Sequence, residues 1–359
     1  MAHFIKCPDP LLSDPNPMDI ALQQLLPHLV AARGNVLWLA DEHVDRSMLT
    51  SLPRLDHVRA LTNRCDVATA LRTHGVDTAL SDFDFTDLPL FDAIFFRVAK
   101  EKPLVHHAIN CALEHLTANG ALWLSGYKND GIKTYLEKAA ARAHGSLQLE
   151  RHGAVLVGTV TKSETLGDAL DDQQYAQLRQ LDFSGEFSAN SKPGIFGWQK
   201  IDAGSAFLIE HLSTVWPQSP KRVLDLGCGY GYLSLMAARQ WPHAQFVGTD
   251  NNIAAVHASA VNFEQATIDA TAICSDAGDI IRESFDAIIC NPPFHQGFAV
   301  DGDLTIRFLR AIKRLLTRRG KALLVVNQFI ALEREAIPLF GAVNVVARNR
   351  SYKLVALEH

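Results

Sequence analysis

A short apolar pattern occurs twice in this chain, about 200 residues apart. Residues 91–96 read FDAIFF and residues 285–290 read FDAIIC. Each copy is followed by a second similar run, NGALWL at 119–124 and GKALLVVN at 320–327. Apolar runs of this length that alternate with amphipathic segments are typical of the buried strands of a parallel α/β sheet. The repetition therefore predicts two tandem α/β domains of the same fold.

The length of 359 residues agrees with this division, because a single domain usually has roughly 100–200 residues. We place the first domain at 1–162 and the second at 191–359. The stretch between them, 163–190, is rich in Asp, Gln, Ser and Gly, a composition that favours a linker.

The composition, with 48% hydrophobic and 20% charged residues, is that of an ordinary globular protein. A formal net charge of −5 excludes a protein coated in basic residues, although a local basic face would suffice to contact nucleic acid. The six cysteines form neither a C-x-x-C pair nor a zinc-type cluster, so no metal site is predicted. The N-terminus has no signal-peptide pattern, and no apolar run approaches the ~20 residues that span a bilayer. We therefore expect a cytoplasmic protein without membrane contact.

A glycine-rich loop, DLGCGYG at 225–231, follows the strand predicted at 222–226. Such a loop lets a ligand approach the backbone and the start of the next helix. Its G-x-G-x-G spacing differs from the dinucleotide-binding pattern. An acid at the mouth of the loop, Asp225, suits a cationic amino-acid cofactor better than a pyrophosphate. We therefore predict S-adenosylmethionine, with a simple tight turn as the alternative.

Two further acids lie in register with this loop. Asp250 ends the next strand about 20 residues later, where it is placed to accept hydrogen bonds from both ribose hydroxyls. Asp276 follows a short apolar run and is placed to reach the adenine amino group. The predicted cofactor-binding residues are Asp225, Gly227, Gly229, Gly231, Asp250, Asn251, Asp276 and Asn291.

The tetrapeptide NPPF at 291–294 follows the strand predicted at 285–290. An aromatic amino group is a poor nucleophile, and two acceptors that hold its two hydrogens direct its lone pair at a methyl donor. The side-chain carbonyl of Asn291 and the backbone carbonyl of Pro292 can supply these acceptors, and Phe294 can stack on the base. We predict that Asn291, Pro292 and Phe294 carry catalysis in a nitrogen methyltransferase. A proline-rich turn is the structural alternative.

The first domain lacks these features. Residues 39–43 read LADEH, without the glycines that admit a cofactor, and FRVA at 96–99 replaces NPPF. We predict that the first domain is an inert duplicate.

Substrate contacts are predicted from the residues that follow the tetrapeptide. His295 is adjacent to it, and an amphipathic helix at 304–316 carries Arg307 and Arg310 on its polar side. A surface histidine and a solvated helix face explain the same residues. The segment before the catalytic unit could also fold over the cofactor, with Phe196 or Asp202 touching it, or serve as an ordinary helix cap.

Together these residues resemble the two-domain bacterial ribosomal RNA guanine-N2 methyltransferases. The resemblance covers nearly the whole chain and is strongest in PGIF at 193–196, DLGCG at 225–229 and NPPFH at 291–295. It implies two tandem Rossmann-like class I methyltransferase domains, of which the degenerate N-terminal one helps to bind RNA. It also implies S-adenosylmethionine as donor and a guanine amine as acceptor, surrounded by Asn291, Pro292 and Phe294. The PGIF segment, followed by DAGS at 202–205, is more similar to the small-subunit (16S) enzymes than to the large-subunit (23S) enzymes.

We therefore expect ribosomal RNA or a ribosomal subunit as the partner and a monomeric protein. A protein glutamine-N5 methyltransferase is a second enzymatic reading, since an amide nitrogen suits the same tetrapeptide, and methylation of adenine N6 is a third. An RNA-binding ribosome assembly factor with a vestigial site is the non-enzymatic alternative. The intact motif residues Asp225, Asp250 and Asn291 speak against it.

Overall fold

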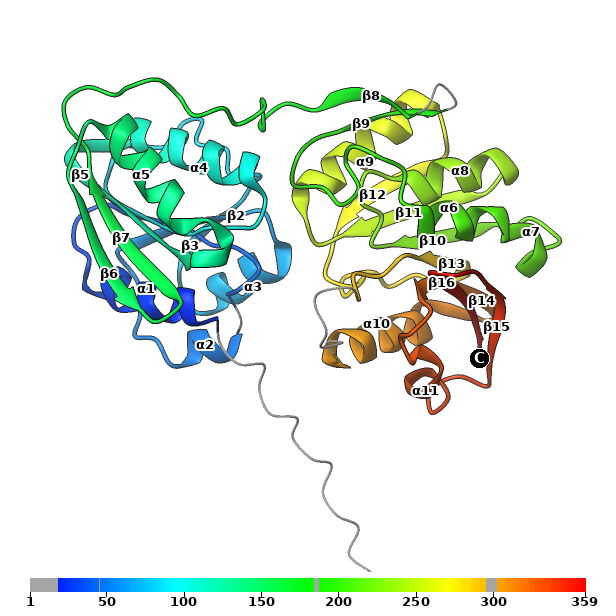
Figure 1. Ribbon diagram of the computed structural model, residues 1–359. Coiled ribbons are helices and arrows are strands. Elements are labelled where there is room, and N and C mark those ends of the chain that lie inside the picture. Colours follow the sequence, from blue (N-terminus) through cyan, green and yellow to red (C-terminus); the bar gives the residue numbers. More distant parts are fainter. Residues whose placement is uncertain (1–18, 45, 184–186, 295–301) are drawn as a thin grey trace, which may run out of the picture.

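The computed structural model describes residues 19–44, 46–183, 187–294 and 302–359 (Figure 1). Each half of the chain contains a seven-stranded sheet flanked by helices, and the two halves lie side by side. In both sheets the first five strands in spatial order are parallel. The sixth strand runs in the opposite direction and pairs antiparallel with both of its neighbours, the fifth strand and the edge strand. The predicted fold class of two tandem Rossmann-like α/β domains is confirmed.

The first sheet has the strand order β3-β2-β1-β4-β5-β7-β6. Its strands are β1 (Val36–Leu39), β2 (Val58–Thr62), β3 (Asp77–Leu80), β4 (Phe91–Arg97), β5 (Leu116–Tyr127), β6 (Leu147–His152) and β7 (Val155–Thr161). Its helices are α1 (Ile20–Ala31), α2 (Arg46–Thr50), α3 (Cys65–Thr73), α4 (Lys102–Glu114) and α5 (Ile132–Ala143), with a 3₁₀ turn at Lys128–Asp130.

The second sheet repeats this topology in the order β12-β11-β10-β13-β14-β16-β15. Its strands are β10 (Arg222–Leu226), β11 (Gln245–Asp250), β12 (Ala270–Cys274), β13 (Phe285–Cys290), β14 (Leu316–Asn327), β15 (Ala342–Arg348) and β16 (Tyr352–Glu358). Its helices are α6 (Ala203–Glu210), α7 (Leu212–Val215), α8 (Tyr232–Gln240), α9 (Ile253–Ala266), α10 (Gly302–Leu315) and α11 (Leu332–Ala336).

The central strands of the second sheet are buried on both faces. Val223 and Leu224 of β10 and Ile288 and Ile289 of β13 have no exposed surface. Residues on alternating sides of these strands enter two different hydrophobic clusters, one on each face of the sheet. This packing fixes the carboxyl ends of β10, β11 and β13 at one edge, where ligands of open α/β sheets bind.

The carboxyl edge of the first sheet is filled by its own side chains. Arg97, at the end of β4, is buried and pairs with Asp19 at 2.9 Å and with Asp130 at 3.5 Å. Asp41, after β1, is buried and contacts His43 at 2.9 Å. In the second domain the corresponding strand ends carry the glycine loop and NPPF. In the first domain these positions are occupied by ion pairs.

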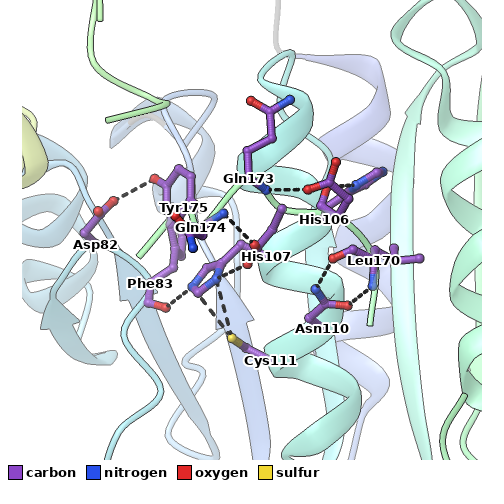
Figure 2. A network of polar contacts seen from close by, with 12 residues as sticks. Asp82, Phe83, His106, His107, Asn110, Cys111, Leu170, Gln173, Gln174 and Tyr175 are labelled. Carbon is purple, nitrogen blue, oxygen red and sulfur yellow. Dashed lines mark hydrogen bonds and ion pairs between the residues drawn. The ribbon is translucent and has the colours of Figure 1, made fainter. Parts of the chain in front are cut away.

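The predicted linker at 163–190 is held in place over most of its described length. Figure 2 shows its first part against α4, where the Leu170 backbone pairs with Asn110, and Asp171 and Asp172 contact two adjacent histidines. Its second part forms a hairpin of β8 (Arg179–Phe183) and β9 (Phe187–Ser191). The hairpin lies against the second domain, because Asn190 donates to Asn262 of α9 at 3.0 Å.

Contacts at two places join the domains within the described ranges. At the first, the buried Lys192 ammonium pairs with Asp82 and lies 3.6 Å from the ring centre of Tyr175, whose hydroxyl donates to Asp82 at 2.7 Å. Lys192 directly follows the hairpin, so this pair ties the start of the second domain to the first domain.

The second place is marked by a reciprocal pair of backbone hydrogen bonds. Cys65 N–H donates to the Asn251 carbonyl, and Ile253 N–H donates to the Asn63 carbonyl, both at 2.9 Å. Arg64 and Asn252 form the β-bridge between them. The strand end before α3 therefore lies against the strand end before α9.

Candidate active site

A cavity of about 680 Å³ opens at the carboxyl ends of β10, β11 and β13. This volume is in the range of small-molecule and cofactor sites. The second domain contributes most of the wall, from the glycine loop, the residues after β11 and β12, the NPPF turn and α10. The first domain closes one side with four polar residues, namely Glu42, His43, Arg64 and Asp66.

The glycines of the loop serve two different purposes. All three have positive φ, +83° at Gly227, +55° at Gly229 and +91° at Gly231. A Cβ at Gly227 or Gly229 would meet no atom within 4 Å, and both residues line the cavity. A Cβ at Gly231 would lie 2.7 Å from the Phe263 ring, so that glycine is required by packing. Open space beside the first two glycines fits the close approach of a cofactor.

The N–H groups at the start of the loop are already used inside the protein. Gly227 and Cys228 donate to the Thr249 carbonyl at 2.8 and 3.0 Å, and Gly229 donates to Asp250 Oδ2 at 3.0 Å. At these positions the loop therefore provides space for a ligand, and its N–H groups are not free to donate to one.

Asp225 lies behind the loop instead of at its mouth. It is fully buried, and its Oδ2 accepts from the N–H and the hydroxyl of Ser234 at 3.0 and 2.8 Å. Its Oδ1 is buried and has no hydrogen-bond partner in the described part of the chain. Burial raises the pKa of Asp225 to about 7, against the opposing effect of the Ser234 hydrogen bonds. A cation held near the loop would favour the ionised form of this carboxyl, which is consistent with an ammonium-bearing cofactor.

The raised pKa of Asp225 predicts a specific pH dependence. In the folded state Asp225 keeps its proton up to about pH 7, whereas in the unfolded state it loses the proton near pH 3.8. Protonation of Asp225 therefore stabilises the folded state at low pH, and this stabilisation is lost as the pH rises across that window. We expect the difference in free energy of unfolding between wild type and Asp225→Asn to change between pH 4 and pH 7 and to be flat above it. Urea unfolding at several pH values measures this. A constant difference from pH 4 to pH 8 would contradict the assignment.

Asp250 ends β11 and faces the cavity. Its Oδ1 accepts from Asn252 N–H at 2.9 Å, and its Oδ2 accepts from Gly229 N–H. Burial raises the pKa of Asp250, while the two backbone donors and the charge of Arg64 oppose the rise. This anchored carboxylate is placed to accept hydroxyl hydrogen bonds from a ligand.

Asn251 and Asp276 complete this end of the cavity. Asn251 Oδ1 accepts from Arg64 at 2.8 Å, which joins this end of the cavity to the first domain. Asp276 Oδ2 pairs with Arg307 of α10 at 2.8 Å. Burial raises the pKa of Asp276, and Arg307 opposes the rise. Arg307, predicted as a substrate contact, therefore pairs with an acid in the wall of the cavity.

The Asn291 amide is oriented by two partners on and before α6. Its Nδ2 donates to Asp202 Oδ2 and to Ser205 Oγ, both at 2.8 Å. Asp202 also caps α6 by accepting from Ser205 N–H at 2.8 Å. With both amide hydrogens engaged, the carbonyl oxygen Oδ1 is the acceptor that this side chain can offer to a ligand in the cavity that Asn291 lines.

Pro292 and Phe294 follow in the same wall of the cavity. The Pro292 carbonyl accepts from Phe294 N–H at 2.8 Å and keeps a second lone pair for another donor. The Phe294 ring is buried and packs edge-on against Phe308 at 5.7 Å between ring centres. Its position in the wall is therefore fixed before any ligand arrives.

Most predicted site residues line this one cavity, and three do not. Asp225 lies behind it, Gly231 packs against Phe263, and Arg310 is exposed on α10 outside the lining. His295 lies outside the described residues. The sequence did not indicate Ser205 or Arg64, and for Asp202 it suggested contact with the cofactor rather than with Asn291. Their only sequence signals were the helix-cap pattern DAGS at 202–205 and the position of Arg64 after a strand end.

The family comparison matches residues 186–356 to the methyltransferase small domain. The second domain is similar to this family. The match begins just before β9 and ends within β16, so it contains the whole lining of the cavity except the four residues of the first domain.

Relatives and a solved structure extend the match to both domains. A protein of Shewanella loihica named ribosomal RNA small subunit methyltransferase C is 29% identical over 74% of this chain and 77% of its own length. A Hahella chejuensis protein of the same name is 25% identical over 80% and 90%. A T. thermophilus 16S rRNA N2 methyltransferase, solved with AdoMet and guanosine, superposes with a TM-score of 0.79 over 93% of this chain and 91% of its own, at 24% identity. The predicted resemblance is confirmed, and this protein is a methyltransferase. In the described residues no helix is long and apolar enough to cross a membrane.

Proposed function

We propose that this protein transfers a methyl group from S-adenosylmethionine to the exocyclic N2 of a guanine in 16S ribosomal RNA. The observation that carries the proposal is the anchored Asn291, whose amide nitrogen is held by Asp202 and Ser205. The names of the relatives and of the solved structure support the choice of donor, RNA and acceptor atom.

The chemistry follows from what these residues can do. S-adenosylmethionine supplies an activated methyl group, so the protein has to position the acceptor rather than act as a strong base. Asn291 Oδ1 accepts one hydrogen of the guanine amine, and the second lone pair of the Pro292 carbonyl accepts the other. The amine lone pair is then turned toward the donor. The Phe294 ring, braced by Phe308, forms a face for the base, and stacking of this kind is worth roughly 1–3 kcal/mol.

The remaining predicted residues are assigned to the cofactor. Gly227 and Gly229 leave room for it, Asp250 takes the ribose hydroxyls, and Asn251 and Asp276 surround the adenine end. Asp225 acts on the ammonium group from behind the loop.

Methyl transfer from labelled S-adenosylmethionine tests the proposal. The acceptors are small subunits, large subunits and naked ribosomal RNA from cells lacking this protein, together with release factors, and each product is hydrolysed to nucleosides or amino acids. We expect N2-methylguanosine in 16S rRNA. Label in 23S rRNA would correct the subunit, N6-methyladenosine would correct the base, and N5-methylglutamine would replace RNA by protein as the substrate. An absence of label in every acceptor would contradict the enzymatic proposal.

A further inference from the structure

The inert domain places an arginine against the cofactor end of the cavity. Arg64 follows β2 and forms the β-bridge with Asn252, so its backbone is fixed on the catalytic domain. Its Nη1 donates to Asn251 Oδ1 at 2.8 Å, and its Nη2 lies 3.5 Å from Glu42. The side chain is only 22% exposed. A guanidinium held this way is part of the cavity wall and not a solvated surface charge.

The surroundings of Arg64 are strongly acidic. Although burial lowers the pKa of Arg64, the carboxylates of Glu42, Asp250, Asp66 and Asp41 raise it overall. On the other side, the groups that face Asp250 are Asp225 on β10, Cys228 in the loop, Cys274 on β12 and Arg64. Arg64 is the cation among them. Its charge opposes the rise in the pKa of Asp250 that burial causes, because a nearby opposite charge favours the ionised carboxylate.

We propose that Arg64 is a positioning residue through which the first domain sustains cofactor binding: it orients the Asn251 side chain and supplies the positive charge that faces Asp250. This inference rests on the proposed function, because it requires that the cavity binds S-adenosylmethionine. It assigns the first domain a role at the cofactor site, separate from any contact with RNA.

The role has a pH signature that a purely structural contact lacks. A carboxylate accepts hydrogen bonds from two hydroxyl groups, whereas a carboxylic acid gives up part of that capacity. Without Arg64, the pKa of Asp250 rises further, so cofactor affinity should fall as the pH is lowered. The substitution Arg64→Lys would restore the positive charge without the planar guanidinium, whose two terminal nitrogens reach Asn251 and Glu42.

Cofactor titration of the full-length protein between pH 6 and pH 8.5 tests this, using S-adenosylmethionine alone and no RNA. We expect Arg64→Met to bind about tenfold more weakly at pH 8, as for the loss of one charge-assisted contact, and progressively more weakly toward pH 6. Arg64→Lys should recover the pH profile of the wild type with a few-fold residual loss. The matched control is Arg59→Gln, on the strand β2 that precedes Arg64, where the arginine pairs with Asp77 away from the cavity. This variant should bind as wild type does.

Two results would overturn the inference. One is Arg64→Met binding that equals wild type at every pH. The other is a loss that is the same at every pH, is shared by Arg64→Lys and accompanies a lower melting temperature, which would make Arg64 a structural contact only. Wild-type protein that binds no S-adenosylmethionine would instead contradict the proposed function, and this outcome is distinguishable because it does not depend on the variants.

Discussion

Replacement of Asn291 by alanine should lower the rate of methyl transfer by about 10²–10³-fold, the usual effect of deleting one preorganised polar contact to a reacting group. The folded structure should persist, because Asp202 still caps α6 through Ser205 N–H when the asparagine is gone. Affinity for S-adenosylmethionine should change little, since the loop and Asp250 are untouched. Single-turnover kinetics on the RNA substrate and a separate cofactor titration measure the two effects.

Ser205→Ala is the matched control for this experiment. It removes one of the two partners of Asn291 Nδ2 and leaves both the amide and Asp202 in place. We expect about a tenfold loss of rate, corresponding to one hydrogen bond. If Asn291→Ala keeps more than half of the wild-type rate, the assigned role is wrong. If Ser205→Ala is as damaging as Asn291→Ala, the effect comes from the α6 start and not from the amide carbonyl.

The second large effect concerns the two purposes of the loop glycines. Gly231→Ala should lower the free energy of unfolding by about 2–4 kcal/mol, because a positive φ and a clash with the Phe263 ring add up. Gly227→Ala has nearly the same φ, but its Cβ meets nothing within 4 Å, so only about 1 kcal/mol of backbone strain is expected. Urea unfolding of both variants in the absence of cofactor measures the difference.

For cofactor binding we expect the reverse, with a larger loss of affinity in Gly227→Ala than in Gly231→Ala. The Gly227→Ala methyl group projects into open space at the cavity wall and should weaken S-adenosylmethionine binding by about tenfold or more. Folded Gly231→Ala protein should bind within a few-fold of wild type. Equal losses of stability in the two variants would contradict the packing explanation for Gly231, and undiminished binding by Gly227→Ala would place the cofactor elsewhere.

Short sequence patterns predicted the strands, the glycine loop and the NPPF turn, because each of these depends on a few consecutive residues. The strands at 222–226, 245–250 and 285–290 lie where their apolar runs indicated, because strands buried on both faces need continuous apolar residues. The run at 320–327 is the end of the longer β14, which begins at Leu316, where it pairs with Phe285. The glycine loop and the NPPF turn were equally visible, since positive φ and fixed prolines are properties of single residues.

Contacts between distant segments could not be predicted from such patterns. Asn291 is anchored by residues 86 and 89 positions earlier, and Arg64 reaches Asn251 across 187 positions. The loop itself gave no sign that Asp225 lies behind it, because burial depends on how α8 packs over the strand end. The linker prediction followed composition and missed that polar residues can hold a segment through hydrogen bonds, as they do against α4 in Figure 2.

The backbone hydrogen bonds between Cys65 and Asn251 and between Ile253 and Asn63 join corresponding segments of the two domains. Their reciprocal pattern is the one expected between two identical subunits. Each partner is offset from its counterpart by the same 188 positions, since 251 − 63 = 188 and 253 − 65 = 188. Equivalent residues that face each other across an approximate two-fold axis define an isologous interface. Thr62 occupies the position in the first domain that Asp250 occupies in the second. The backbone hydrogen bonds of the residues that follow each of them are nevertheless the same. The two domains therefore contact each other through corresponding segments, and the same contact holds Arg64 at the cavity of the second domain.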